Sequence, residues 1–575
     1  MLDTDSTIYA LSTAPGRAAI AVVRVSGPAC PSVRLHPTIR SIFPLRPVPT
    51  NAPLHQIYQA LCPTTSIPKP RFAALRTLYD PSHPPSPNTV LDAGALVLYF
   101  PGPKTVTGED VLEFHIHGGP AIVKAVLSAI SRTHQPDAAV RYAEPGEFTR
   151  RAFMNDRLGL PQIEALGDTL SADTEQQRRL AVRGASAALL NRYEAWRQTL
   201  LYARGELEAL IDFAEDQHFD ESTEELVASV SAQVRALAVQ IGFHIQNASR
   251  GELRRSGIRV ALLGAPNAGK SSLLNRVVGT EAAIVSTEQG TTRDIVDVGV
   301  DLGGWYCKLG DMAGIRAEAG GSAAVIGAVE KEGIRRARAR ALESDVVVVV
   351  VSLEDSDTAG GVRLLVEPEV LAAVDDCVEA GKCLVVAVNK CDKLPTEEWR
   401  DELPPALAET VRDVFPAVPA ERVFAISCND AQRGSLPLTG KRAQNPSDPG
   451  HLQAFLHGLI STFEQIASPL GVGDEGGQYD KSYWEDSLGV THRQSSNLQI
   501  CLDHLEDFLS QTSPAAPLDA PASHSHERDP ASIAVEIDIV TAAEHLRFAA
   551  DMLAKITGKG ESGDVEDVLG VVFEK

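Results

Sequence analysis

The sequence predicts a multidomain protein with an α+β N-terminal domain, a discontinuous helical domain, and an α/β domain with a phosphate-binding loop inserted into the helical one. The 575 residues exceed what one hydrophobic core usually supports, so two to four domains are expected. Long helical periodicity occurs in two separate blocks, at 168–215 and from Tyr479 onwards. Between these blocks, strand patterns alternate with helical patterns, which is typical of a parallel α/β sheet.

The chain divides at changes in this periodicity. Near the N-terminus, short β-branched runs at 20–25 and 95–100 alternate with Pro-rich stretches that we expect to be surface insertions. A Ser/Pro/Ala/His segment at 510–532 cannot form a core, so a flexible loop is expected there. The predicted domains are 1–156 (α+β), 157–255 (helical, first part), 256–468 (α/β) and 469–575 (helical, second part).

Composition narrows the function classes. The chain is 44% hydrophobic and 22% charged, as in ordinary soluble proteins. A net charge of -23 argues against a surface that binds nucleic acid everywhere. Contact with RNA would need a local group of basic residues, and the sequence has two such groups. For each group taken alone, a solvated helix face is favoured over RNA binding. The two groups are Arg335, Arg336, Arg338 and Arg340, and Arg250, Arg254, Arg255 and Arg259.

The eight cysteines include no CxxC pair, which fits a reducing compartment, and buried thiols are expected at Cys383 and Cys391. No membrane span is expected, because we find no apolar stretch of roughly 20 residues. The valine run 346–351 is short and is predicted to be a buried parallel strand. No targeting segment is visible at the N-terminus, and this observation leaves the compartment open.

A phosphate-binding loop follows the predicted strand 258–263. The run from Gly264 to Ser271 reads Gly-Ala-Pro-Asn-Ala-Gly-Lys-Ser and leads into a helical segment, which matches the P-loop pattern in its required context. Backbone N–H groups can surround phosphates here, Lys270 can bridge the β- and γ-phosphates, and Ser271 can ligate Mg²⁺. The predicted contacts in this loop are Gly264, Asn267, Ala268, Gly269, Lys270, Ser271 and Ser272.

Two further segments fit a γ-phosphate sensor. Asp311-Met312-Ala313-Gly314 follows the predicted strand 305–309, so Asp311 can hold a water on Mg²⁺ and the Gly314 N–H can contact the γ-phosphate. Thr292 stands where a switch threonine completes the metal shell. Ile315 occupies the position that often carries a water-orienting glutamine, so another group must position the water.

The base is predicted to be guanine. Asn389-Lys390-Cys391-Asp392 ends the predicted strand 384–388, and a carboxylate at Asp392 can accept both guanine N1–H and the exocyclic amine, which adenine cannot offer. Ser427-Cys428-Asn429 is a looser match to the second base-facing loop. Four elements in this order at strand ends predict GTP as the ligand.

The sequence also resembles the MnmE/TrmE family of tRNA-modification GTPases, including mitochondrial relatives, over nearly the whole chain outside the Pro-rich insertions. The strings that carry this resemblance are Pro15-Gly16-Arg17, Arg24-Val25-Ser26-Gly27, Phe100-Pro101-Gly102-Pro103, Thr107-Gly108-Glu109-Asp110, His117-Gly118-Gly119-Pro120, the run from Pro145-Gly146-Glu147-Phe148 to Met154-Asn155, and Gly290-Thr291-Thr292-Arg293-Asp294.

The resemblance implies a P-loop GTPase domain activated by K⁺-dependent dimerisation, with K⁺ standing where an arginine finger would act. Asn267 matches the family's K⁺-binding asparagine, and the alternative is that it only braces the loop. Ser286, which replaces the usual threonine, and Thr291 match further K⁺ ligands, and Glu288 would offer its backbone carbonyl. The implied catalytic residues are Lys270, Thr292 and Glu330, of which Glu330 would orient the attacking water. The segment before Glu330, 317–328, is longer than the family's.

The N-terminal region resembles the family's folate-binding domain, which also forms the homodimer. Arg24, Glu113 and Arg157 match residues that hold 5-formyl-tetrahydrofolate. The family has lysine at Arg157, so the charge is kept but the geometry differs. A solvated strand charge is the alternative for Glu113. The resemblance implies that the folate supplies a one-carbon unit for a 5-aminomethyl-type group on the wobble uridine of tRNA, with an FAD-dependent partner protein and a mitochondrial location.

The family ends in a Phe-Cys-x-Gly-Lys tail, whereas this chain stops at Glu574-Lys575 and no cysteine follows Cys501. A truncated sequence and a copy without the terminal thiol both stay open, and GTP hydrolysis is expected in either case. Two other functions also stay open. One is a ribosome-assembly or RNA-chaperone GTPase switch, which would not bind folate. The other is a nucleotide-dependent scaffold, which would hydrolyse GTP without modifying tRNA.

Overall fold

The computed structural model describes residues 6–27, 53–133, 139–213, 223–278, 283–287, 298–310, 326–355, 362–394, 399, 403–434, 448, 450–470, 481–512 and 538–558. Contacts between residues divide the chain into two compact units. One comprises Met1–Glu164 with Ala554–Lys575, and the other comprises Ala165–Leu553. Each unit is described by itself.

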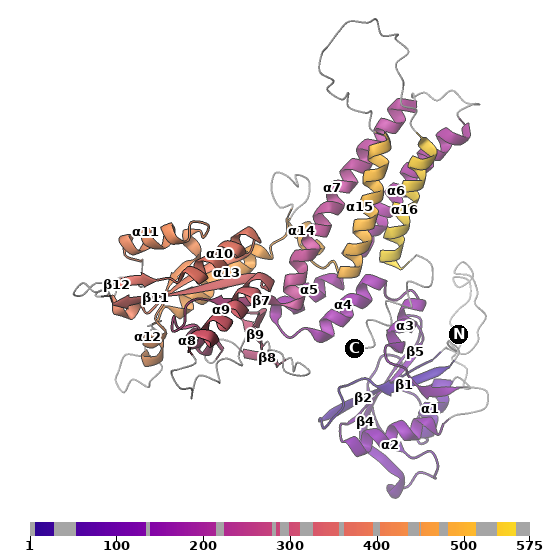
Figure 1. Ribbon diagram of the computed structural model, residues 1–575. Helices are drawn as coiled ribbons and strands as arrows, with labels where there is room; N and C mark the ends of the chain where they lie inside the picture. The colour runs from indigo at the N-terminus through magenta and orange to yellow at the C-terminus, as the bar shows by residue number, and fades with distance from the viewer. Residues whose placement is uncertain are drawn as a thin grey trace, which may run out of the picture. The chain divides into compact units, whose positions relative to one another are not determined.

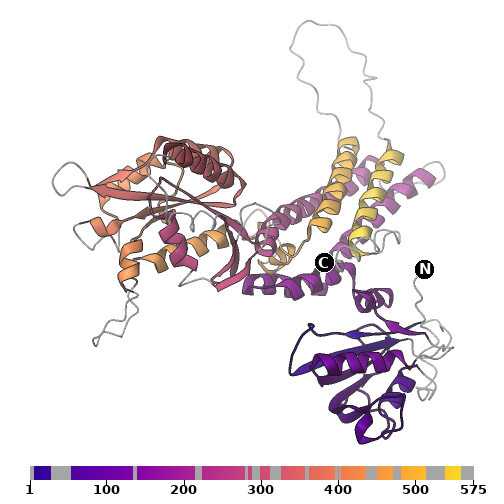
Figure 2. The same cartoon turned by 60° about the horizontal axis from the view of Figure 1, so that its bottom comes forward.

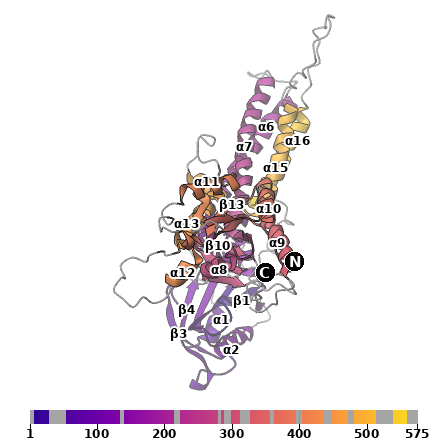
Figure 3. The same ribbon diagram turned by 60° about the vertical axis from the view of Figure 1, so that its left-hand side comes forward.

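The first unit contains a six-stranded sheet in the order β3-β4-β5-β2-β1-β6, in which only the β1/β6 pair is parallel among the described strands. Helices α1 and α2 contribute to the same core against this sheet, which fits the predicted α+β class (Figures 1 and 3). The elements are β1 (Thr7–Leu11), β2 (Ile20–Gly27), α1 (Pro53–Leu61), β3 (Ala74–Tyr79), β4 (Val90–Phe100), β5 (Asp110–His117), α2 (Pro120–Ser131), β6 (Val140–Tyr142) and α3 (Glu147–Met154).

Seven helices make up the described helical part of the chain, and they come from both sides of the α/β domain. They are α4 (Leu160–Ser171), α5 (Glu175–Gly184), α6 (Ala187–Phe213), α7 (Thr223–Ser256), α14 (Lys481–Ser487), α15 (His492–Thr512) and α16 (Ile539–Thr557). Helix α7 packs along α6 and α15, and the long helices α6, α7, α15 and α16 run side by side in both views (Figures 1 and 2). Buried hydrogen bonds join the two halves, from Ser231 Oγ to Thr512 Oγ1 at 2.9 Å and from Asn247 Nδ2 to Ser487 Oγ at 2.8 Å. The prediction of a discontinuous helical domain is confirmed.

The periodic run 168–215 covers parts of three helices, and Thr174 starts the second of them, α5, with a capping box to Gln177. One detail of the helical prediction differs from the structure. The predicted loop start at Ser510 is wrong, because α15 continues to Thr512, where the buried bond to Ser231 holds the last turn. Residues 513–532 of that predicted loop lie outside the described residues.

Helix α7 is the one described helix that is long and apolar enough to cross a membrane, with a mean hydropathy of 1.4 over its most apolar window. The sequence analysis expected no such stretch, so this helix corrects that expectation as far as length and composition are concerned. Length and composition are weak evidence, because core helices pass the same test, and α7 packs against α15, α6, α5 and α14.

The α/β domain is built on an eight-stranded sheet ordered β14-β13-β11-β7-β10-β9-β8, with β12 paired to β11. Strands β14, β13, β11, β7 and β10 are mutually parallel. The strands are β7 (Ile258–Leu263), β8 (Ala283–Thr287), β9 (Val298–Leu302), β10 (Trp305–Leu309), β11 (Val346–Asp355), β12 (Val362–Leu365), β13 (Cys383–Asn389) and β14 (Val423–Ala425). The helices are α8 (Lys270–Arg276), α9 (Ile326–Glu343), α10 (Pro368–Glu379), α11 (Pro405–Val414), α12 (Cys428–Gly434) and α13 (Leu452–Ile466).

The valine run in β11 shows why this sheet is buried on both faces. Val346, Val348 and Val350 belong to the core that includes α8 and α13, whereas Val347, Val349 and Val351 belong to the core that includes α10 and α11. Successive side chains of a strand point to opposite faces, so an unbroken apolar run fits a strand covered on both sides. The prediction of a buried parallel strand is confirmed. Because the central strands are parallel, the loops that follow them emerge at one edge of the sheet.

Candidate functional site

The phosphate loop after β7 is locked to the loop after β13. Asn389, which is 2% exposed, donates from Nδ2 to the carbonyl of Ala268 at 2.8 Å. Gly269 follows with φ +101, a backbone conformation that favours glycine, and an added Cβ there would lie 2.0 Å from the same Asn389 nitrogen. The two motifs that the sequence places 120 residues apart are therefore one structural unit.

Lys270 lies over the carbonyl oxygens at the start of the loop. Its Nζ donates to Gly264 O and Ala265 O, each at 2.7 Å. The loop backbone also runs close to β11, since a Cβ on Gly264 would lie 2.1 Å from the Val350 carbonyl oxygen. Two backbone carbonyl oxygens therefore hold the ammonium group of the lysine that the P-loop pattern assigns to the phosphates.

The base-facing side of the site centres on Asp392. Its Oδ1 accepts from Ser427 Oγ at 2.8 Å, and its Oδ2 accepts from Asn429 Nδ2 at 3.0 Å. The Cys428 N–H donates to Asn389 Oδ1 at 3.2 Å, so Asn389 also connects this loop to the phosphate loop. These bonds orient the carboxylate, and a carboxylate is the acceptor that two N–H groups of a base require.

One residue of this site was missed by the sequence analysis. Glu354, near the end of β11, accepts from Lys390 and from Lys393 Nζ at 2.7 Å, and these bonds lower the pKa of Glu354 to about 2. Lys390 has φ 64, so the ion pair holds a residue in the left-handed region. An acidic residue at the end of a central strand was the available signal for Glu354.

The thiols near the base-facing loops are packing groups. Burial raises the pKa of Cys391 to about 12 and that of Cys428 to about 11, so both remain protonated at neutral pH. Cys391 is fully buried, as predicted, whereas Cys383 is only half-buried.

The structure describes only some of the residues predicted to bind metal ions or to form the switch segments. Ser271 lies in the first turn of α8 beside the exposed Ser272, and Asn267 is exposed with φ 61. Ser286 lies in β8 and Glu330 in α9, but their side chains are outside the described part of the chain. The remaining predicted residues lie outside the described residues altogether: Glu288, Thr291, Thr292, Asp311 and Gly314.

In the N-terminal unit, Arg24 and Glu113 are a cross-strand pair. They face each other in the β2/β5 register, and Arg24 Nε donates to Glu113 Oε1 at 2.9 Å. Their side chains are 26% and 15% exposed, so Glu113 is not simply a solvated charge. Arg157 instead donates from Nε to the Thr105 carbonyl at 3.0 Å.

A cavity of about 500 Å³ in the same unit lies between β1, β2 and α2, lined mainly by apolar groups with Lys124 at its wall. Its volume is in the range of small-molecule sites. None of the three predicted folate residues lines it, and of the residues that carry the family resemblance it includes Pro15, Gly16 and Pro120. The cavity and the Arg24–Glu113 pair are therefore different features of this unit.

The arginines that end α7 form intramolecular contacts. Arg250 and Arg254 donate to the carbonyls of Ser468 and Ala467, at 2.8 and 3.1 Å. Arg255 donates to Asp168 at 2.8 Å, and Arg259 forms an ion pair with Asp345. This group is thus neither a freely solvated face nor an open basic patch. Of the second group, Arg338 forms an ion pair with Asp376.

A P-loop and two base-facing loops at the carboxyl edge of a parallel sheet define the class of protein, which is a GTPase. Comparison with known proteins gives the family. Residues 7–157 match the family model described as the GTP-binding protein TrmE N-terminus, and residues 160–575 match that of the MnmE helical domain. The chain belongs to the MnmE/TrmE family of tRNA modification GTPases.

Individual relatives match over most of their length. A mitochondrial 5-taurinomethyluridine tRNA synthase subunit of Homo sapiens is 38% identical, over 99% of this chain and 92% of its own length. The mitochondrial tRNA modification GTPase mss1 of Schizosaccharomyces pombe is 32% identical over 99% of this chain and 94% of its length. The tRNA modification GTPase MnmE of Parvibaculum lavamentivorans is 40% identical over 72% of this chain and 83% of its length.

Proposed function

We propose that this chain hydrolyses GTP during formation of a 5-aminomethyl-type group on the wobble uridine of tRNA. The observation that carries the proposal is the joined phosphate and guanine loops, in which Asn389 bonds both Ala268 and Cys428 while Asp392 is oriented by Ser427. Membership in a family of tRNA modification GTPases supports tRNA modification as the process in which GTP is hydrolysed. A formyl-tetrahydrofolate would provide the one-carbon unit, and an FAD-dependent protein would share the reaction.

Each nucleotide-site residue has a role in this proposal. Lys270 would leave the loop carbonyls for the β- and γ-phosphates, and Ser271, Thr292 and Asp311 are the residues that would hold Mg²⁺, which would neutralise charge on the phosphates. The Gly314 N–H contacts the γ-phosphate, and Asp392 selects guanine. Since Ile315 cannot bind water, Glu330 orients the attacking water.

Potassium is proposed to neutralise charge that develops between the phosphates, with Asn267, Ser286, Thr291 and the Glu288 carbonyl as ligands. Asn267 supports this assignment, because its side chain is exposed and makes no recorded hydrogen bond to the described part of the chain. A residue that only braced the loop would need such a bond.

GTP hydrolysis is expected to be at least about tenfold faster in K⁺ than in Na⁺, because a fixed cation at the developing charge stabilises the transition state. Asn267→Ala should remove this difference, and the two rates are compared at saturating GTP so that a change in nucleotide affinity does not enter. Asn497→Ala, on α15, is the matched control and should keep it. The measurement is phosphate release at equal ionic strength in the two salts. Equal rates for the unaltered protein would remove K⁺ from the mechanism.

Folate binding is the second test of the proposal. Titration with 5-formyl-tetrahydrofolate is expected to show saturable binding that Arg24→Ala weakens at least tenfold, because hydrogen bonds to charged groups contribute about 1.5–3 kcal/mol. Arg132→Ala, which removes an exposed ion pair with Asp80 in the same unit, should leave the affinity unchanged. A chain that binds no folate would instead favour a ribosome-assembly role.

The proposal includes the domain boundaries 1–156, 157–255, 256–468 and 469–575, a homodimer formed through the first of these, and a mitochondrial location. The full-length similarity to mitochondrial relatives supports the location, although bacterial relatives match as well. Imaging of the tagged chain in its own cells tests it, and a signal outside mitochondria would contradict it.

A further inference from the structure

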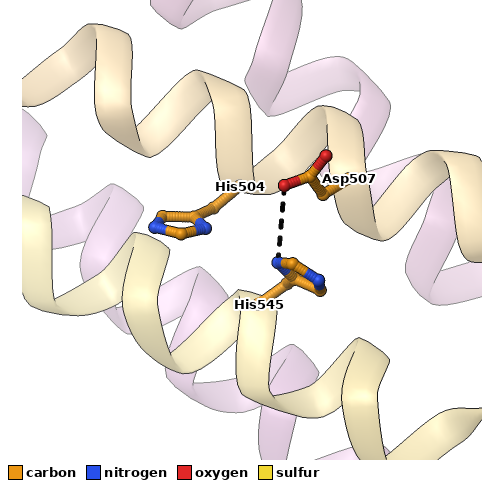
Figure 4. Close-up of side chains that lie close together, drawn as sticks. All are labelled: His504, Asp507 and His545. Atoms are coloured by element: carbon orange, nitrogen blue, oxygen red, sulfur yellow. Dashed lines mark ion pairs between the residues drawn. The ribbon is translucent and has the colours of Figure 1, made fainter.

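The helical domain holds a polar cluster that belongs to none of the sites above. It consists of His504 and Asp507 on α15 and His545 on α16 (Figure 4). One donor atom from each residue lies within 4.8 Å of the other two, and no other group of three His, Cys, Asp or Glu side chains was found to come this close within the described ranges. We propose that this cluster binds a divalent cation of the zinc type and thereby links α15 to α16.

Helix geometry places the three side chains together. Residues three or four apart share a helix face, so His504 and Asp507 both point toward α16. Phe548, three residues beyond His545 on α16, stacks on the His504 ring with centroids 5.3 Å apart and planes 28° apart. The rings of His504 and His545 lie 5.7 Å apart. Packing against Phe548 therefore fixes the orientation of one imidazole beside the other.

The imidazole nitrogens in this cluster lack ordinary partners. The Nδ1 atoms of both histidines are buried and accept or donate no hydrogen bond within the described chain. Asp507 Oδ2 lies 3.8 Å from His545 Nδ1, which is an ion-pair distance but too long for a hydrogen bond (Figure 4). Buried polar atoms are almost always satisfied in folded proteins. A cation between these groups would satisfy both nitrogens and the carboxylate.

Gln511 supplies the outer partner that a metal-bound histidine needs. Its Nε2 lies 3.1 Å from His545 Nε2, whereas its Oε1 is buried without a hydrogen-bond partner in the described chain. Turning the amide over exchanges the two atoms, and Gln511 Oε1 then accepts the Nε2–H of His545. That bond fixes the tautomer whose Nδ1 lone pair faces Asp507. Histidine ligands commonly donate their other N–H in this way.

The donor set selects the class of ion. Two imidazoles and one carboxylate suit Zn²⁺, Co²⁺, Ni²⁺ or Cu²⁺, whereas Mg²⁺ and Ca²⁺ prefer oxygen ligands. Tetrahedral bonds of about 2.0–2.2 Å place donor atoms about 3.4 Å apart, so the cluster must tighten slightly. Asp507 can make this movement because its side chain is 61% exposed, and that exposure leaves a fourth position for water.

The local charge favours a cation. From Gln494 to Thr512 the sequence of α15 contains no Lys or Arg, while Asp503 and Glu506 neighbour the cluster on the same helix. On α16, Arg547 is held in ion pairs with Glu544 and Asp551. In the segments 494–512 of α15 and 544–551 of α16, no positive charge without an ion-pair partner therefore opposes an ion at His504, Asp507 and His545.

The test is a Co²⁺ titration of the full-length, untagged, nucleotide-free chain, followed by visible absorption and repeated with Zn²⁺ as competitor. One equivalent should bind and Zn²⁺ should displace it, with a rise in the melting temperature on saturation. His545→Ala should abolish this binding, and Asp507→Asn should weaken it at least tenfold. Matched controls are His492→Ala, an exposed histidine on the same helix, and His524→Ala with His526→Ala, a histidine pair close by in the sequence; neither should change binding.

Binding that survives both Asp507→Asn and His545→Ala would overturn the proposal, as would binding lost in the variant of His524 and His526. If circular dichroism shows that His545→Ala does not fold, Asp507→Asn decides the question. This substitution keeps the shape of an exposed side chain and removes only its charge. An unchanged Co²⁺ affinity in that variant would exclude the site.

Discussion

Asp392→Asn is expected to lower GTP affinity by about 100-fold or more and to raise affinity for xanthosine triphosphate. The carboxylate would accept guanine N1–H and the exocyclic amine, and hydrogen bonds to charged groups contribute about 1.5–3 kcal/mol each. An asparagine amide turns one acceptor into a donor, which opposes the guanine amine but suits the carbonyl that xanthine carries there. Ser427 and Asn429 should keep the new side chain in place, since the Asn429 amide can turn over to present its oxygen.

The measurement is displacement of a fluorescent guanine nucleotide by GTP and by xanthosine triphosphate. Asp375→Asn, an exposed position on α10, is the matched control and should bind GTP as the unaltered chain does. GTP affinity that stays the same in Asp392→Asn would remove Asp392 from the site.

Gly269→Ala is expected to reduce nucleotide affinity by about 100-fold and to lower stability. At φ +101 an alanine carries about 1–3 kcal/mol of backbone strain, and its Cβ would lie 2.0 Å from the Asn389 nitrogen. The contact is relieved when the Asn389 side chain turns away or when the phosphate loop moves from it, and either movement breaks the bond to Ala268. The strain and the lost bond act on both halves of the nucleotide site together.

The same substitution at Gly205 provides the control. Gly205 lies on α6 with open space around its Cβ position, so alanine there should stabilise the helix by about 0.5–1 kcal/mol. Thermal melts should therefore show a lower melting temperature for Gly269→Ala and a higher one for Gly205→Ala. Nucleotide titrations should show weaker binding for Gly269→Ala alone. Normal nucleotide binding by Gly269→Ala would show that the Asn389 contact does not hold the loop.

Much of the α/β domain could be predicted because its signals are local. Strand patterns fixed β7 and β10 to the residue, and the P-loop pattern requires a strand before it and a helix after it. Parallel strand order then explains why Lys270, Asn389 and Asp392 meet at one edge. The discontinuous helical domain was also predictable, since helical periodicity stops before the inserted domain and resumes after it.

Other contacts depend on distances that sequence does not carry. Glu354 is a single acidic residue in the chain until the fold brings Lys390 and Lys393 to it. The arginines ending α7 look like a basic patch, yet carbonyls of Ala467 and Ser468 and the carboxylate of Asp168 accept their hydrogen bonds. His504 and His545 are 41 residues apart, and only the packing of α15 on α16 joins them.

The most direct test of the account is a parallel titration of the unaltered chain with GTP and ATP in the presence of Mg²⁺. Because Asp392 can pair with guanine but not with adenine, GTP should bind at least about 100-fold more tightly. Equal affinity for the two nucleotides would contradict the guanine site, and with it the function proposed for this protein.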